Sequence, residues 1–183
     1  MTPPRILPLI LASGILLMLP ACKSPMAQGT REVQFTASKS PWRTSVGQLQ
    51  YANPKRSVIG GVVVSRRGPN DFRLEFTAGP GVPLLRLQES ATLARAEGLF
   101  ARGFWVGEPK KAPRHLESWV SLREIFASVE GTGKARVTPV SFKSAAGDPN
   151  PWSATAEVAD GKTRRLQVSF AQTGERLTFV LGE

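Results

Sequence analysis

Alternation of apolar and polar residues at every second position dominates the chain after residue 45. Phe72, Leu74 and Phe76 alternate with polar side chains, and Leu166 and Val168 begin a similar run near the end of the chain. A period of two places successive side chains on opposite faces of a β-strand, so each run predicts a strand with one buried face. Less regular runs of this kind occur at residues 46–52, 56–66, 84–88, 91–98, 136–142, 152–158 and 177–181. Residues 31–37 form a weaker candidate strand.

One stretch follows a helical period instead. Leu116, Trp119 and Phe126 recur at helical spacing, which predicts an amphipathic helix over residues 116–129. Gly131 and Gly133 follow this stretch and are expected to end the helix. It is the one helix that the pattern predicts after the N-terminal region.

The strand pattern predicts a curved sheet. About nine strands joined mainly by short turns favour an antiparallel arrangement. Gly60 and Gly61 interrupt a β-branched run at residues 57–64 and predict a bulge or a sharp bend there. We therefore expect an α+β fold, mainly antiparallel β, in which a strongly curved incomplete barrel (a half-barrel) carries one helix or a few helices as a lid.

The N-terminal region has the pattern of an export signal. Arg5 precedes an apolar run at residues 6–18, which is shorter than the roughly 20 residues needed to span a bilayer. The run ends in Leu19-Pro20-Ala21-Cys22, which resembles the lipobox of bacterial lipoproteins. The resemblance implies that the Cys22 thiol is alkylated with diacylglycerol, that residues 1–21 are removed, and that the new amino group is acylated. The alternative is an ordinary signal peptide in which Cys22 is incidental.

The interpretation of residues 19–22 as a lipobox predicts the domain boundaries and the cellular location. Cys22 is the only cysteine in 183 residues, so it forms no internal disulfide, and an anchor explains its presence better. Residues 22–42 are rich in polar residues and proline and are expected to form a lipidated N-terminus and flexible tether. Residues 43–183 then form a single domain. The resemblance to bacterial lipoproteins implies that a residue other than Asp after the cysteine, here Lys23, favours the outer membrane. We therefore expect a cell-envelope protein that faces the periplasm and is anchored by lipid, and we expect it to be a monomer.

Charge and residue usage exclude several classes of function. The formal net charge is +10, but the basic residues are scattered and nucleic acid is not an expected partner of an exported protein. The basic surface is either simply solvated or a patch for anionic lipid headgroups. His115 is the only histidine, the only thiol is expected to be acylated, and no cluster has metal-ligand spacing. We therefore expect no enzyme activity, no metal and no cofactor.

The apolar face of the predicted sheet is compatible with two functions, a structural one and a ligand-binding one. Four tryptophans, Trp42, Trp105, Trp119 and Trp152, suit either a solid core or an apolar ligand pocket. A solid core would indicate a structural or scaffold lipoprotein of the envelope, whereas a pocket would indicate binding of apolar ligands.

Two segments resemble the family of the outer-membrane lipoprotein receptor LolB and its soluble relative LolA. Residues 71–87, DFRLEFTAGPGVPLLRL, are similar to the strand–loop–strand of the receptor, with a Pro/Gly loop between two apolar strands. Leu116, Trp119 and Leu122 match its helix, and the order of elements is similar over residues 43–183. The resemblance implies an incomplete barrel that encloses a cavity for acyl chains, and a role in lipoprotein localisation and insertion. A periplasmic lipoprotein carrier and lipidated proteins would be its partners.

The resemblance and the strand period together name candidate site residues. The expected lining of the cavity is Phe72, Leu74, Phe76, Leu85, Leu87, Trp119, Phe126, Leu166, Val168 and Phe170. The Pro/Gly loop, with Pro80 and Val82, would contact the membrane, where the family receptor projects a leucine. The long N-terminal helix of the family is replaced here by the polar tether.

Overall fold

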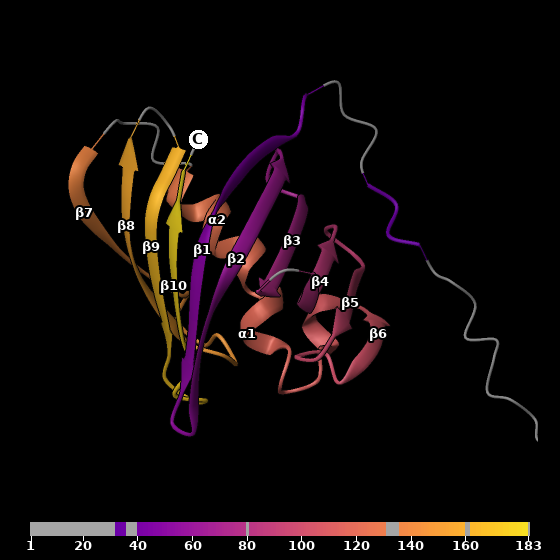
Figure 1. Cartoon of the computed structure of the whole chain (residues 1–183). Helices are drawn as coiled ribbons and strands as arrows, with labels where there is room; N and C mark the ends of the chain where they lie inside the picture. The colour runs from indigo at the N-terminus through magenta and orange to yellow at the C-terminus, as the bar shows by residue number, and fades with distance from the viewer. Residues whose placement is uncertain (1–31, 36–39, 80, 131–135, 160–161, 183) are drawn as a thin grey trace, which may run out of the picture. The chain divides into compact units, whose positions relative to one another are not determined.

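A computed structural model describes residues 32–35, 40–79, 81–130, 136–159 and 162–182, which all lie in one compact unit, Arg31–Glu183 (Figure 1). Within these residues the chain forms ten strands that share one sheet. They are β1 (Arg43–Asn53), β2 (Arg56–Arg67), β3 (Asp71–Ala78), β4 (Val82–Glu89), β5 (Ala94–Gly98), β6 (Gly103–Gly107), β7 (Arg136–Lys143), β8 (Trp152–Ala159), β9 (Lys162–Phe170) and β10 (Arg176–Leu181).

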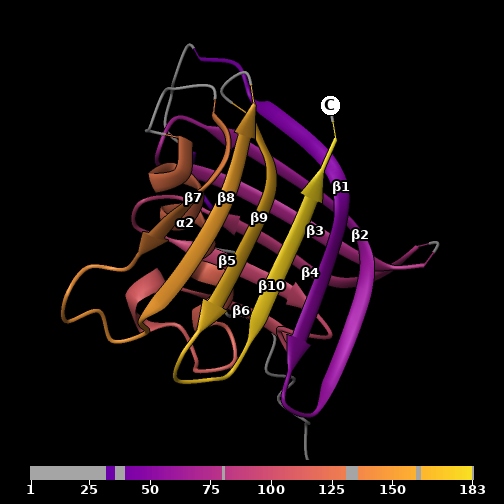
Figure 2. The same ribbon diagram turned by 90° about the vertical axis from the view of Figure 1, so that its left-hand side faces the viewer.

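The sheet is antiparallel throughout and open. Its strand order is β6-β5-β4-β3-β2-β1-β10-β9-β8-β7, so β6 and β7 are the two edges. The first strand lies in the middle because β1 pairs with β2 on one side and with the last strand, β10, on the other. The sheet bends strongly, so that β3–β6 cross behind β7–β10 and β1 (Figure 2). The expectation of a mainly antiparallel fold with helices is confirmed, and the sheet does not close into a barrel.

A helical segment connects the two edge strands. It consists of the 3₁₀ helix η1 (Pro109–Lys111), α1 (Glu117–Val120) and α2 (Leu122–Glu130), and it lies between the two halves of the sheet (Figures 1 and 2). α1 packs near β4, and α2 packs near β8 and β9. The predicted helix over residues 116–129 is confirmed, with a break at Ser121, where one short helix ends and the next begins. The glycines expected to end it lie outside the described residues.

Three details of the strand prediction need correction. Residues 103–107 form a tenth strand, because β6 pairs with β5 over its whole length. Residues 32–35 are not in a strand. Of the two alternatives predicted for Gly60 and Gly61, the bulge is absent, since β2 pairs with both β1 and β3 without a register shift, and the sharp bend stays a prediction. A Cβ atom on Gly60 would lie 2.0 Å from the Thr77 carbonyl oxygen, so the residue allows a close approach of β3 instead.

One hydrophobic core holds the sheet and the helical segment together. Every strand from β1 to β5 and from β8 to β10 contributes residues to it, and so do α1 and α2. Along β8, and along β9 from Leu166 to Phe170, every second side chain is buried, as the alternation predicts. The opposite, convex face of these strands carries mainly polar side chains.

Candidate functional site

The ten expected cavity residues all lie in the core between the sheet and the helical segment. Each has an exposed fraction of 2% or less. Leu74 lies opposite Leu87 and Phe76 lies opposite Leu85 in the β3–β4 pairing, while Leu166, Val168 and Phe170 share the inner face of β9. Sequence periodicity therefore identified residues that the fold brings onto one continuous apolar surface.

Aromatic rings from the helical segment touch rings of the sheet directly. Trp119 of α1 stacks on Tyr51 of β1, with ring centroids 5.6 Å apart, and lies 6.1 Å from Phe76. Phe126 of α2 lies 5.8 Å from Phe72 and 5.4 Å from Phe179 of β10. In this conformation the rings of α1 and α2 fill the space between the helices and the sheet.

Sequence reasoning missed three residues of this aromatic layer: Tyr51, Phe100 and Phe179. Phe179 shares the buried face of β10 with Leu177 and Leu181 at every second position, so its period could have identified it. Phe100 lies in the turn between β5 and β6, where no period exists. Its position depends on the hydrogen bond that its backbone N–H donates to the Leu84 carbonyl, at 2.9 Å.

Polar contacts join the helical segment to the rest of the domain through Ser118, Arg123 and Glu130. Ser118 Oγ donates to Glu175, whose other carboxylate oxygen accepts from the Tyr51 hydroxyl at 2.8 Å. Glu130 at the end of α2 pairs with Arg66 of β2. Burial, together with the hydrogen bond to Glu175, raises the pKa of Tyr51 to about 12, so the phenol stays a donor at neutral pH.

The third polar contact involves a fully buried carboxylate. Arg123 Nε of α2 donates to Glu89 Oε1 at the end of β4, at 2.8 Å. Glu89 is 0% exposed, and its Oε2 has no hydrogen-bond partner. Burial raises the pKa of Glu89 to about 7, although Arg123 acts in the opposite direction. This contact is therefore sensitive to pH near neutrality.

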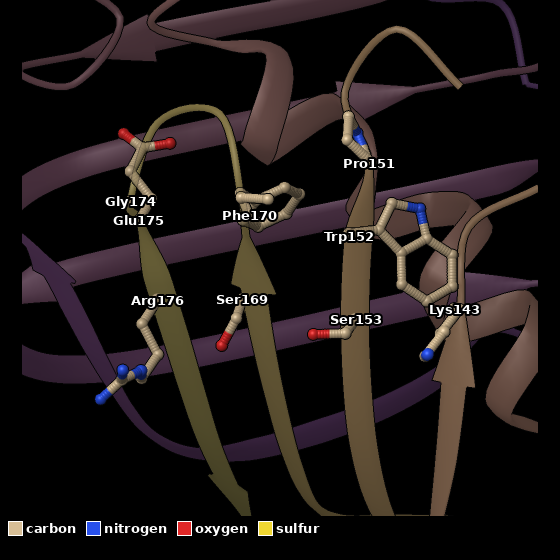
Figure 3. A pocket seen from close by; sticks show the side chains of 10 residues that line it. Lys143, Pro151, Trp152, Ser153, Ser169, Phe170, Gly174, Glu175 and Arg176 are labelled. Atoms are coloured by element: carbon tan, nitrogen blue, oxygen red, sulfur yellow. The ribbon is translucent and has the colours of Figure 1, made fainter. Parts of the chain in front are cut away.

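A surface pocket of about 330 Å³ lies at the β8–β10 end of the sheet (Figure 3). Lys143, Ser153, Ser169 and Arg176 form one row across four neighbouring strands. The two cations lie at opposite ends of this row, and the Arg176 guanidinium points away from Lys143 (Figure 3). The pocket therefore does not direct both charges at one ligand position. Among the expected cavity residues, Phe170 lines it.

The remaining predicted site residues have separate locations. Val82 begins β4 and is exposed, whereas Pro80 and Cys22 lie outside the described residues. His115 is half-buried before α1. Searched over the described residues, the chain has no group of three or more His, Cys, Asp or Glu side chains suited to a metal ion. None of the helices in that part of the chain combines the length and the apolar character needed to cross a membrane.

Comparison with known proteins gives no assignment. No family model matches the chain, and no curated protein sequence matches it.

Proposed function

We propose that the chain is a lipid-anchored protein of the cell envelope that binds acyl chains between its sheet and its helical segment. In this proposal the sheet is a half-barrel, the helical segment is its lid, and Cys22 carries the anchor. The observation that carries the proposal is the single apolar surface that runs from β4 to β9 and is covered by a segment of short helices. Handling of lipoproteins, in the manner of LolB, requires such a surface and a membrane anchor but no catalytic group.

Binding requires the lid to move. Trp119 and Phe126 occupy the space next to the sheet, so an acyl chain has to replace them there. Exchanging one apolar surface for another changes the hydrophobic free energy little, because the contribution follows the apolar area removed from water. The main cost of opening is therefore the loss of the polar contacts made by Ser118, Arg123 and Glu130.

The partners follow from this mechanism. A carrier in the periplasm would deliver lipidated proteins, and the anchored domain would accept their acyl chains and release them into the outer membrane. Transfer between apolar sites needs no cofactor.

A second candidate function is supported by the ring contacts themselves. If the aromatic layer is permanently closed, the domain is a structural or scaffold lipoprotein with a solid core, whose basic surface contacts envelope polyanions or a protein. The exposed fractions of 2% or less of the candidate lining residues agree with both candidates.

A binding assay separates the two candidates. The chain from residue 23 onward retains every described contact, because these all lie within Arg31–Glu183. We would titrate it with a fluorescent fatty acid and expect saturable binding of one ligand. Ser118→Ala removes one lid contact and should tighten binding several-fold, whereas Ser128→Ala, whose hydroxyl donates to Glu124 within α2, should not. Absence of saturable binding by folded protein would leave only the scaffold function.

The anchor needs its own test. Cys22→Ala in the full chain should abolish incorporation of labelled fatty acid and release the protein from membranes. Retention of the variant in the membrane fraction would refute the role of Cys22.

A further inference from the structure

An exposed apolar patch lies at the β6 edge of the sheet. Val82, Leu99 and Phe104 have exposed fractions of 55%, 64% and 46%. Leu99 lies in the turn between β5 and β6, and Phe104 is the second residue of β6. The β3–β4 hairpin lies beside this turn because the Leu84 carbonyl accepts the N–H of Phe100. We call these three residues the edge patch.

Basic side chains lie along the β6 edge, at both ends of the strand. Arg102 is exposed in the same turn, and the Arg95 guanidinium lies 5.1 Å from the Phe104 ring. Lys110 and Lys111 follow directly after β6 in η1, and Lys111 pairs with Glu108 at 2.9 Å. Apolar side chains beside cations are typical of surfaces that lie at the boundary between anionic headgroups and acyl chains.

The N-terminal part of the unit is fastened close to this edge. Val33 is buried, and Glu32 and Gln34 line a cavity of about 690 Å³ together with Trp105 and Gly107 of β6. The Arg73 guanidinium lies 4.4 Å from the rings of both Phe35 and Trp42, which meet edge to face at 5.1 Å. We call the contacts of Phe35, Trp42 and Arg73 the clasp.

Covalent geometry limits the distance between the proposed anchor and the first described residue, Glu32. Ten Cα–Cα steps separate Cys22 from Glu32, so these residues span at most about 36 Å, against roughly twice that distance if the chain were free up to Trp42. The described chain begins at Glu32, beside β6. A lipid at Cys22 therefore keeps the β6 edge within a short reach of the bilayer surface.

From these observations we infer that the β6 edge docks on an anionic lipid bilayer, with Leu99 and Phe104 entering the interface and Arg102 and Lys110 contacting headgroup phosphates. The inference rests on the proposed lipid anchor and adds an orientation to it. Val82 at the start of β4 contributes a smaller apolar side chain than Leu99 of the β5–β6 turn and Phe104 of β6.

A second patch provides a matched control. Val46, Val63 and Val180 form an exposed apolar group on β1, β2 and β10, where Val46 lies opposite Val63. This central patch lies in the middle of the sheet, on strands that do not line the cavity beside Glu32. Val46→Ser with Val180→Ser thus removes a comparable exposed apolar area without touching the edge.

The test uses the lone cysteine as an attachment point. The chain beginning at Cys22 is coupled through its thiol to a maleimide lipid in vesicles, and hydrogen exchange is measured along the chain. On vesicles containing phosphatidylglycerol, we expect exchange in residues 99–106 to slow on the order of ten-fold, and less on phosphatidylcholine alone or at high salt. Leu99→Ser with Phe104→Ser should abolish this protection, Arg102→Gln should weaken it, and the central-patch variant should retain it.

Other outcomes overturn the inference. Unchanged exchange in residues 99–106 of the folded, coupled protein excludes docking through this edge. Protection that persists in the edge variant, or that appears at the central patch, places the contact elsewhere. Protection without vesicles that grows with protein concentration shows that a second copy of the chain covers the edge. Because the anchor is attached chemically in this experiment, its result does not depend on acylation of Cys22 in cells.

Discussion

The protein has two apolar regions that differ in what covers them. Phe126 in the interior is fully buried and contacts Phe72, Phe179 and the Arg66 guanidinium. Phe104 at the β6 edge is nearly half exposed, and Arg95 stacks on it. The chain covers the first region with its own helices and leaves the second open. The interior therefore stabilises the fold, whereas the edge is available for contacts outside the chain.

Truncating one phenylalanine in each region should give the largest difference. Phe126→Ala removes a buried ring and leaves a cavity, so the free energy of unfolding should fall by about 3–5 kcal/mol. Phe104→Ala should change it by about 0.5 kcal/mol or less, because the ring is exposed. Urea unfolding followed by tryptophan fluorescence measures both values. Similar losses in the two variants would contradict the distinction between interior and edge.

The interior variant also bears on acyl binding. If the space vacated in Phe126→Ala accepts an acyl chain, added fatty acid should raise the midpoint of unfolding of this variant more than that of the unaltered protein. A midpoint that does not respond in either protein favours the solid core.

The carboxylates of the two regions should differ in their response to pH. Glu89 is buried, and its pKa is raised from 4.5 to about 7. Between these pH values the folded state holds a proton that the unfolded state has lost, so stability falls as pH rises. The contribution is complete below about 4.5 and is lost as pH rises through about 7, which amounts to on the order of 3 kcal/mol.

Glu89→Gln should remove this dependence. The free energy of unfolding of the unaltered protein should decline relative to that of the variant between pH 4.5 and 8, as measured by urea unfolding at several pH values. Glu97→Gln is the matched control at the edge, since Glu97 is partly exposed and pairs with Arg86 and Arg95 at 3.6 and 3.3 Å. Such exposed pairs contribute about 0–1 kcal/mol. A constant difference between Glu89→Gln and the unaltered protein would show that Glu89 is ionised throughout.

The sequence predicted the parts of the fold that depend on local period. Alternation identified the buried faces of β3 and β9, and helical spacing identified Trp119 and Phe126, because burial repeats with the geometry of each element. The pairing of β1 with β10 joins residues more than 120 positions apart, such as Leu49 and Phe179, and no local pattern encodes it. The contact between Arg123 of α2 and Glu89 of β4 likewise joins separate elements, and no local pattern encodes it.

The edge was harder to predict than the interior. The tip of the Pro/Gly loop was predicted by resemblance, but Leu99 was not among the predicted site residues, since its exposure depends on a turn that points Phe100 inward. The clasp lies in a stretch whose polar composition predicted a flexible tether. Composition describes the average behaviour of such a stretch and does not show that Val33 and Phe35 pack on the domain.

The smallest expected effect concerns the clasp. Arg73→Ala removes the guanidinium that lies against Phe35 and Trp42, and each cation–π contact at an exposed site contributes about 0.5–1 kcal/mol. Global stability should therefore fall by about 1 kcal/mol, while backbone amides of residues 32–35 should exchange faster by roughly ten-fold because they separate from the domain. Arg86→Ala on the same face of the sheet is the control and should leave exchange in residues 32–35 unchanged, since Arg86 pairs with Glu75 and Glu97.

In the vesicle-coupled protein, Arg73→Ala should also reduce the protection of the edge patch. Loss of the clasp increases the number of residues between Cys22 and the first residue held on the domain, so the domain can adopt more orientations relative to the bilayer. Undiminished protection of residues 99–106 in that variant would show that the edge binds the bilayer without help from the clasp.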